Sequence, residues 1–512
     1  MLVKTFGAAV QGITATVVTI EVNISQGIRF LIVGLPDNAV RESHERIASA
    51  LSFAEKKLPR MQVVINMAPA DIRKEGSAYD LPLAVGILAA SQQIKSDGLD
   101  KFLLMGELSL DGGMKPIKGA LPIAIKAREA GFKGLIIPYQ NAKEAAVVSG
   151  IDVYGVKDIR EVISLLNGNP TIEPVRVNTD ELFYDTHKNL EMDFSDVKGQ
   201  ENVKRAFEVA AAGSHNIILV GPPGAGKSMM AKRLPTIMPP MTLEEALETT
   251  KIHSVAGNID SNTALVAQRP FRSPHHTISD VALVGGGAFP QPGEISLAHH
   301  GVLFLDELPE FKRSVLEVMR QPLEDRKISI SRAKFAVDYP ASFMLVASMN
   351  PCQCGYYNHP EKDCVCAPGS VRKYLSRISG PLLDRIDIHI EIVPVPFEKL
   401  SEQREAEKSE CIRERVIKAR KIQEIRFKDI DGVYCNAQMT SKLQRKFANP
   451  DKSGTELLKN AMKRLNLSAR AYDRILKVSR TIADLEGSEN ICAYHIAEAI
   501  NYRNLDREGW AG

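Results

Sequence analysis

The sequence predicts a multidomain α/β protein with an α+β N-terminal domain, a core built on a parallel sheet between helices, and a helical C-terminal domain. Its 512 residues exceed what one compact core usually holds, which indicates two to four domains. Short apolar runs alternate with helical patterns up to about residue 397, and charged helical periodicity follows. The predicted boundaries are 1–170, a polar linker at 171–194, a core at 195–397 and a C-terminal domain at 398–512.

The composition argues against several classes of protein. Hydrophobic residues make up 44% and charged residues 25%, as in ordinary globular proteins, and a net charge of +3 neither requires nor excludes nucleic acid. No apolar run approaches the ~20 residues that span a bilayer, and the N-terminal sequence lacks the pattern of a signal peptide. Seven cysteines, an odd number, do not indicate a disulfide framework. We therefore expect a cytoplasmic protein with no membrane partner.

Each domain is predicted from its periodicity. Apolar runs predict N-terminal strands at 17–22, 29–35, 61–68, 102–110 and 134–138, with helices at 41–56 and 118–131. The C-terminal domain is expected to be helical at 401–427, 455–465, 468–487 and 492–503.

A glycine-rich loop follows an apolar strand at 216–220 and precedes a helical pattern. It matches G-x-x-x-x-G-K-S, with the positions filled by Gly221, Pro222, Pro223, Gly224, Ala225, Gly226, Lys227 and Ser228. Glycines let backbone N–H groups approach phosphate oxygens, and the helix N-terminus adds partial positive charge. The pattern predicts ATP binding, with Lys227 bridging the β- and γ-phosphates and Ser228 holding Mg²⁺. A chance glycine turn before a helix is the competing interpretation.

Two further apolar strands end in polar side chains. The strand at 301–307 ends in Asp306, expected in the Mg²⁺ shell, and Glu307, expected to act as the general base on the attacking water. The competing interpretation is a buried strand followed by two solvated acids. The strand at 343–351 ends near Asn350, at the position where an AAA+ protein places the group that orients this water.

The core as a whole resembles AAA+ ATPases, and the resemblance implies further roles. Val197 and Gln200, about twenty residues before the loop, would wrap the adenine. Arg377 and Arg385 are candidates for an arginine supplied in trans to a neighbouring subunit, with Arg385 preferred, and Arg470 would close over the phosphates from the helical domain. Surface charge is the competing interpretation for each arginine. The resemblance implies a homo-hexamer that forms on nucleotide or DNA binding.

The block at 271–311 resembles the magnesium-chelatase motor family, and within it the ComM/YifB family of competence-associated ATPases. That resemblance covers nearly the whole chain. It implies a hexameric DNA helicase that drives branch migration during integration of transforming DNA and homologous recombination. The alternatives are a chelatase motor that drives metal insertion or remodels a protein partner, and an ATP-dependent protease.

A predicted hairpin at 326–343 carries the candidate DNA contacts. Arg332 and Lys334 lie near its turn, and Lys327 lies close by. In this AAA+ clade such hairpins line the ring pore, where basic groups would hold phosphates of single-stranded or branched DNA without reading its sequence. A hairpin with ordinary solvated charges is the competing interpretation.

The N-terminal domain resembles the proteolytic domain of Lon in the stretches 69–88 and 106–122. Ala78 stands at the position of the nucleophilic serine, with Ser77 one residue early, and Pro122 stands at the position of the lysine. A Ser–Lys dyad needs both groups. We therefore expect a non-proteolytic, Lon-like domain.

Four cysteines cluster within fifteen residues: Cys352, Cys354, Cys364 and Cys366. Four thiolates suit a tetrahedral Zn²⁺ site, and reduced cysteines in a polar loop are the competing interpretation. Cys411, Cys435 and Cys492 stand alone and are expected to be packing residues. Two histidine pairs, at 275–276 and 299–300, are expected to be structural, because neighbouring residues of a strand point to opposite faces.

Overall fold

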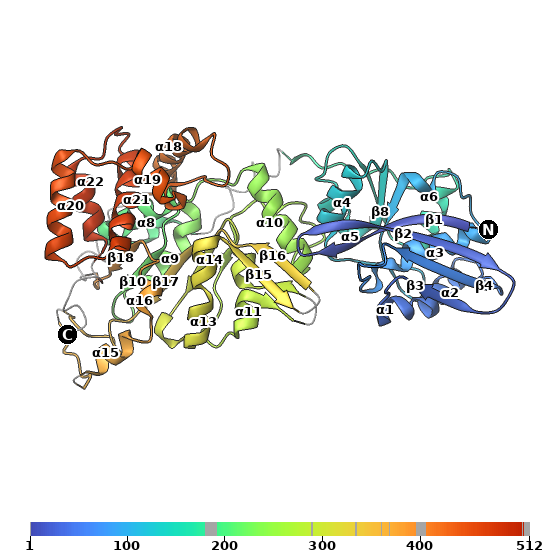
Figure 1. Ribbon diagram of the computed structural model, residues 1–512, viewed down its shortest axis with the longest axis horizontal. Helices are drawn as coiled ribbons and strands as arrows, with labels where there is room; N and C mark the ends of the chain where they lie inside the picture. Colours follow the sequence, from blue (N-terminus) through green and yellow to red (C-terminus); the bar gives the residue numbers. More distant parts are fainter. Residues whose placement is uncertain are drawn as a thin grey trace.

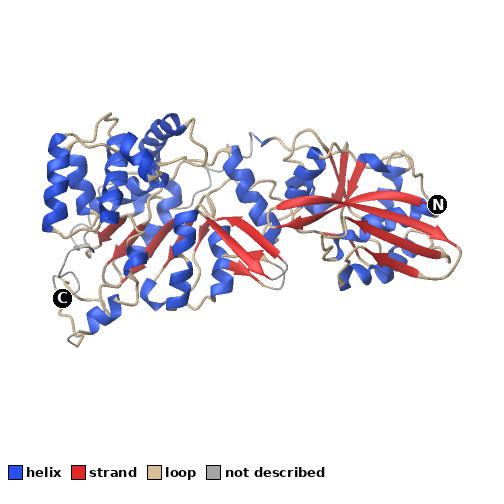
Figure 2. Cartoon of the chain, in the orientation of Figure 1, coloured by secondary structure: helices blue, strands red, loops and turns tan. Residues whose placement is uncertain are grey.

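The protein is described by a computed structural model that covers residues 2–179, 192–287, 290–332, 335–359, 361–367, 369–395, 406–503 and 505. The N-terminal domain forms one end of an elongated molecule, the core lies in the middle, and the C-terminal helices form the other end (Figure 1). Strands and helices are mixed in the first two parts, whereas the third is helical (Figure 2). Among the described residues, no helix is long and apolar enough to cross a membrane.

The N-terminal domain contains two larger sheets around one apolar core. The first has the order β1-β2-β4-β3, and the second is parallel, with the order β5-β8-β9. Their strands, with the small β6–β7 hairpin, are β1 (Leu2–Gln11), β2 (Thr14–Ser25), β3 (Phe30–Val33), β4 (Gln62–Ala68), β5 (Phe102–Leu104), β6 (Glu107–Leu108), β7 (Met114–Lys115), β8 (Gly134–Pro138) and β9 (Asp152–Val156). The helices are α1 (Asn38–Arg41), α2 (Ser43–Phe53), α3 (Asp80–Ala90), α4 (Ala120–Glu129), α5 (Tyr139–Ala145) and α6 (Ile159–Leu166).

Two of these elements differ from the sequence prediction. The apolar run at 102–110 forms two short strands, β5 and β6, and the helical pattern at 41–56 forms a shorter helix, α2, that follows the four-residue helix α1. Helix α3 is buried on all sides because its residues are almost all apolar, so it carries no amphipathic signal.

The core contains a five-stranded parallel sheet with the order β11-β14-β17-β10-β18. Its strands are β10 (Ile217–Val220), β11 (Phe271–Arg272), β14 (Val302–Leu305), β17 (Met344–Met349) and β18 (Ile388–Glu391). Strands β10, β14 and β17 are buried along their whole length, as expected for a parallel sheet covered on both faces. The predicted α/β content and parallel sheet are confirmed.

Alternate residues of β10 enter different apolar clusters. Ile217 and Leu219 pack with α8 (Glu201–Gly213) and α9 (Lys227–Ile237), whereas Ile218 and Val220 pack on the other face with α13 (Arg313–Val318). The period of two in a strand thus places helices on both faces of the sheet. The remaining core helices are α10 (Leu243–Ala256), α11 (Asp280–Val284), α12 (Glu294–Leu297), α14 (Arg320–Asp325), α15 (Ser370–Leu375) and α16 (Gly380–Leu383).

Two hairpins extend the core. The predicted hairpin at 326–343 is confirmed as β15 (Lys327–Arg332) paired with β16 (Phe335–Pro340). A smaller one pairs β12 (Gly285–Gly286) with β13 (Gln291–Pro292). The turn between β1 and β2 of the N-terminal domain contacts β16, since a Cβ on Gly12 would lie 2.6 Å from the Val337 side chain (Figure 1).

The C-terminal domain shares an apolar core with the sheet domain. Its helices are α18 (Ser409–Phe427), α19 (Ser441–Phe447), α20 (Lys452–Arg464), α21 (Ala469–Leu485) and α22 (Ala493–Asn501). Helices α18 and α21 both pack on α8, so their apolar residues join one cluster with β10. The helical pattern predicted from residue 401 begins later, because 406–408 are not helical and 401–405 lie outside the described residues. At the predicted linker, Phe194 is fully buried in this cluster and already belongs to the core.

Candidate nucleotide-binding and hydrolysis site

The glycine-rich loop leaves the carboxyl end of β10 and ends at the first turn of α9. Gly224 and Gly226 have φ of 79° and 86°, in the left-handed region that favours glycine. Helix α9 begins at Lys227, so the loop's last backbone N–H groups and the helix N-terminus face the same space. This strand–loop–helix arrangement is the one expected for a phosphate cradle.

The Lys227 ammonium is held in place by three oxygens. Its Nζ donates to Gly221 O at 2.7 Å, to Pro222 O at 2.9 Å and to Asn350 Oδ1 at 3.0 Å. Burial lowers the pKa of Lys227, and the charges of Asp306 and Glu307 oppose that shift. An ammonium has three donors, so a phosphate that binds Lys227 must displace at least one of these oxygens.

Ser228 and Asp306 meet although they lie on different elements. Ser228 Oγ, on α9, donates to Asp306 Oδ2 at 2.7 Å at the end of β14, and Ser348 Oγ from β17 donates to Asp306 Oδ1. Hydroxyl and carboxylate oxygens are ligands that Mg²⁺ prefers, and Mg²⁺ in such sites keeps several waters and substrate phosphates. The donor set next to Lys227 therefore fits Mg²⁺ bound to a nucleotide.

Glu307 presents a largely exposed carboxylate next to His276. Its backbone has a φ of 55°, its side chain is 58% exposed, and its Oε2 lies 3.7 Å from His276 Nδ1. A half-exposed carboxylate beside a phosphate cradle can accept a proton from water. The position of His276 beside Glu307 was not predicted, because 31 positions separate the two residues along the chain.

The adenine candidates lie at a neighbouring hollow. Val197 is buried in the core cluster, and Gln200 Nε2 donates to Val393 O at 2.5 Å. A cavity of about 320 Å³ is lined by 199–203 and by Glu391 and 393–395. A second hollow, of about 50 Å³, shares Val393 with it and includes Gly221 and Pro222 of the phosphate loop. Gln200 thus lines a cavity next to the loop, whereas Val197 is buried in the core and is not among the residues that line it.

The candidate arginines are placed differently from one another. Arg385 is only 8% exposed; its guanidinium lies 2.5 Å from Glu324 and donates to Pro381 O. Arg377 is 46% exposed and pairs with Glu310 at 3.0 Å. A side chain that reaches a neighbouring subunit must be exposed in the single chain, so Arg385 would have to leave Glu324 to act in trans. Arg470 on α21 is exposed and pairs with Asp384 at 3.2 Å, next to Arg385.

The candidate DNA contacts are only partly described. Arg332 ends β15, but its side chain and the whole of Lys334 lie outside the described residues. Lys327, at the other end of β15, pairs with Asp338 at 3.2 Å.

The Lon-like segment faces a cavity at the junction with the core. Ser77 and Ala78 begin the turn before α3, and the Ser77 hydroxyl donates to the Glu107 carboxylate. Pro122 lies buried in α4. The cavity holds about 540 Å³ and is lined by residues of both domains, among them Lys118 and Val337. A serine bonded to a carboxylate, with proline at the lysine position, lacks the base that a Ser–Lys dyad requires.

The four clustered cysteines come together. The sulfurs of Cys352, Cys354, Cys364 and Cys366 all lie within 4.8 Å of one another, and all four are free thiols. Of the isolated cysteines, Cys435 is buried as predicted, but Cys411 is exposed on α18 and Cys492 is only half-buried at the start of α22. The prediction that all three pack in the interior was therefore wrong for Cys411.

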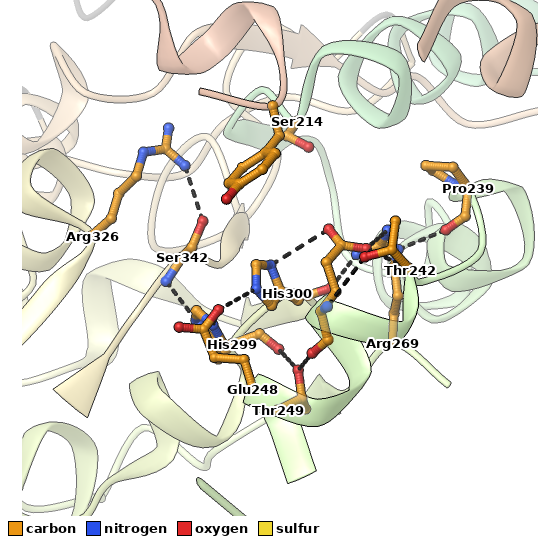
Figure 3. Close-up of polar contacts among 12 residues, drawn as sticks. Ser214, Pro239, Thr242, Glu248, Thr249, Arg269, His299, His300, Arg326 and Ser342 are labelled. Carbon is orange, nitrogen blue, oxygen red and sulfur yellow. Dashed lines mark hydrogen bonds and ion pairs between the residues drawn. The ribbon is translucent and has the colours of Figure 1, made fainter. Parts of the chain in front are cut away.

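The histidine pairs do not point to opposite faces of a strand, as was predicted, because their rings lie side by side. His299 and His300 lie in a turn before β14, with His300 at a φ of 55°, and their rings are 3.9 Å apart at the centroids. Both Nε2 atoms approach the same Glu248 oxygen of α10, at 3.1 and 3.0 Å (Figure 3). His275 and His276 also lie side by side, with centroids 4.1 Å apart. Turn geometry, not strand alternation, sets their directions.

Glu248, His299 and His300 have the composition of a metal site, but one hydrogen bond argues against it. The backbone N–H of Ser342 donates to His299 Nδ1 at 3.0 Å (Figure 3). The neutral ring therefore carries its proton on Nε2, which faces Glu248 and has no lone pair for a metal. Burial lowers the pKa of His299 to about 4, consistent with a neutral ring beside an ionised carboxylate. The cluster ties α10 to the segment before β14, in agreement with the predicted structural role.

Comparisons with known proteins cover nearly the whole chain. The family profiles "Magnesium chelatase, subunit ChlI", "Subunit ChlI of Mg-chelatase" and "Magnesium chelatase, subunit ChlI C-terminal" match residues 193–400, 20–141 and 406–503. Competence protein ComM of Haemophilus influenzae is 44% identical over 504 residues, covering 98% of this chain and 97% of that protein. The uncharacterized protein YifB of Escherichia coli is 42% identical over 503 residues, covering 98% and 96%. Lon protease 2 of Bacillus subtilis is 32% identical over 157 residues, covering 28% and 27%.

Proposed function

Because the chain belongs to the ComM/YifB family of magnesium-chelatase-like AAA+ proteins, we propose that it is an ATP-driven DNA motor serving competence and recombination. The convergence of Lys227, Ser228 and Asp306 at the carboxyl ends of β10 and β14, two strands of the same parallel sheet with β17 between them, carries the proposal for ATP hydrolysis. The competence role rests on the name of the relative from H. influenzae. A helicase that promotes branch migration of single-stranded or branched DNA is the finer form of this proposal.

Chain residues would supply each step of hydrolysis. Backbone N–H groups of the loop and Lys227 would hold the phosphates, and Ser228 with Asp306 would hold Mg²⁺, which polarises the γ-phosphate when bound. Glu307 would take the proton of the attacking water, and Asn350, 3.0 Å from Lys227 Nζ, would orient that water.

Assembly and DNA contact complete the proposal. A homo-hexamer would place one arginine of each subunit, Arg385 or Arg377, at the neighbouring site, where such a group is worth roughly 10³–10⁵ in rate. Arg470, beside Asp384, would follow the movement of the helical domain. Arg332 and Lys334 at the hairpin tip would contact DNA phosphates in the pore. The N-terminal domain, which we propose to be Lon-like and non-proteolytic, contacts the same hairpin through Gly12.

The first experiment measures steady-state ATPase activity with and without single-stranded and forked DNA, at two salt concentrations. Stimulation by DNA that weakens with salt supports a DNA motor, because phosphate contacts release counterions. Replacing both Arg332 and Lys334 with alanine should reduce the slope of log DNA affinity against log salt concentration by about 1.4, because two phosphate contacts to a single strand are lost. Lys327→Ala is the matched control, because Lys327 lies on the same hairpin but already pairs with Asp338. Activity indifferent to DNA would overturn the proposal.

One observation favours a second candidate, a motor that remodels a protein partner. The cavity of about 540 Å³ between the N-terminal domain and the core includes the hairpin residue Val337 in its lining, so a ligand there would contact the hairpin directly. A DNA-independent ATPase that a protein fraction stimulates would support this alternative over the DNA motor.

A further inference from the structure

The loop that follows Asn350 carries four thiols in a segment with little other support. Residues 351–359 and 361–367 contain no helix or strand, and most of their side chains are polar or exposed. Fixing such a loop costs about 1–2 kcal/mol of backbone entropy per residue. Apolar burial offsets little of this cost here, because Cys352 and Gly355 are among its few buried residues.

The sulfur positions match a tetrahedral metal centre. A Zn–S bond of about 2.3 Å implies sulfurs roughly 3.8 Å apart at the corners of a tetrahedron. The sulfur of Cys364 lies 3.7 Å from that of Cys352 and 3.6 Å from that of Cys354, and Cys352 and Cys354 are 3.3 Å apart. Cys366 completes the set within 4.8 Å. These separations are too long for a disulfide, whose sulfurs are about 2.05 Å apart.

Backbone N–H groups also face the sulfurs. Those of Tyr356 and Val365 lie near the Cys354 sulfur, and that of Tyr357 lies near the Cys352 sulfur. Donors of this kind stabilise thiolates and orient them in metal sites. They come from both halves of the loop, so the two Cys-x-Cys pairs are turned toward a common centre.

The same loop forms a wall of the nucleotide site. Gly355, between Cys354 and Tyr356, is packed so closely on the phosphate loop that a Cβ there would lie 2.6 Å from Pro223 Cδ. The hollow of about 50 Å³ is lined by Gly221 and Pro222 on one side and by Tyr357 and its neighbours on the other. Asn350, which accepts from Lys227, precedes the first cysteine by two residues.

We propose that Cys352, Cys354, Cys364 and Cys366 bind one Zn²⁺ and that this zinc loop, through Gly355, holds the phosphate loop in the nucleotide-binding arrangement. The metal has a structural role: four thiolates close its coordination and leave no position for water or substrate. The coupling to nucleotide rests on the assignment of the ATP site proposed above, whereas the metal site rests on the cysteines alone.

The test measures zinc and nucleotide binding in the full-length protein, purified under reducing conditions with zinc supplied. We expect one zinc per chain by elemental mass spectrometry, and tetrahedral thiolate absorption when Co²⁺ replaces zinc. Cys364→Ser together with Cys366→Ser should lose the metal and bind a fluorescent ATP analogue about tenfold more weakly. Cys411→Ser, which changes an exposed cysteine on α18, is the matched control and should keep both properties.

A second variant separates the metal from its effect on the nucleotide. Gly355→Ala keeps all four cysteines but places a methyl group against Pro223, so it should retain zinc and still weaken nucleotide binding. Removal of zinc from the unmodified protein by a chelator should weaken binding, and zinc added back should restore it, which excludes misfolding of a variant as the cause.

Two results would overturn the proposal. Protein that binds neither zinc nor Co²⁺ and titrates as four free thiols contradicts the metal site. Nucleotide affinity that is unchanged in the zinc-free protein contradicts the coupling. Neither measurement requires DNA or hydrolysis, so a protein that binds zinc and nucleotide but ignores DNA would contradict only the proposed DNA motor.

Discussion

Replacing Asn350 with alanine should raise ATP affinity slightly while nearly abolishing hydrolysis. In the nucleotide-free chain Asn350 Oδ1 is one of the three oxygens that hold the Lys227 ammonium. Hydrogen bonds to charged groups contribute about 1.5–3 kcal/mol. Lys227 is half-buried, so water replaces part of the lost bond and about 1 kcal/mol remains. A phosphate that displaces Asn350 no longer competes with it, which corresponds to roughly fivefold tighter binding.

The catalytic effect has the opposite sign. If Asn350 orients the attacking water, its loss removes a preorganised polar group of the transition state, worth about 10²–10³ in kcat. The assay pairs a fluorescent-nucleotide titration with steady-state ATPase measurements on the same protein. Asn262→Ala is the matched control, because Asn262 also accepts from a lysine, Lys143 at 3.5 Å, but on an exposed surface away from the loop.

Two outcomes would refute this reasoning. Nucleotide binding that weakens tenfold or more in Asn350→Ala would mean that Asn350 contacts ground-state ATP instead of competing with it for Lys227. A kcat within twofold of the unmodified protein would remove Asn350 from the transition state.

Glu307→Gln should bind nucleotide normally and hydrolyse it at least ~10²-fold more slowly, because it loses the general base; normal turnover would contradict that role. Arg385→Ala should bind nucleotide but lose roughly 10³ in hydrolysis, and mixing it with Lys227→Ala subunits should restore activity if the arginine acts in trans. If Arg377→Ala loses hydrolysis and is rescued by mixing while Arg385→Ala stays active, the arginine that acts in trans is the exposed Arg377. Burial lowers the pKa of His299 to about 4 from an unfolded value near 6.5, so its neutral ring stabilises the fold above pH 6.5 and this contribution is lost as pH falls toward 4. Between pH 6.5 and 4 the free energy of unfolding of His299→Gln, measured by thermal unfolding, should therefore fall by up to roughly 3 kcal/mol less than that of the unmodified protein. An identical pH dependence of the two proteins would contradict the buried, neutral ring.

The phosphate cradle could be predicted from the sequence because one short segment encodes it. Gly224, Gly226 and Lys227 supply the turn, the close approach and the charge within a strand–loop–helix unit, and local backbone preferences suffice to form it. The polar residues at the ends of the buried strands could also be predicted, because parallel strands carry Asp306 and Asn350 to the same edge of the sheet. The cysteine cluster was predicted from spacing alone, and its sulfurs do converge.

What the sequence could not determine are contacts between segments whose relative placement depends on turns and packing. Strand alternation was the wrong rule for His299 and His300, because a left-handed turn at His300 directs both rings toward Glu248. The neighbour of Glu307, the buried state of Arg385 and the packing of Gly355 on the phosphate loop likewise depend on crossovers that join distant parts of the chain. Local motifs fix which groups are present and how each is presented. Only the packed tertiary structure decides which of them meet, because the close approach of distant segments depends on the whole core that holds them.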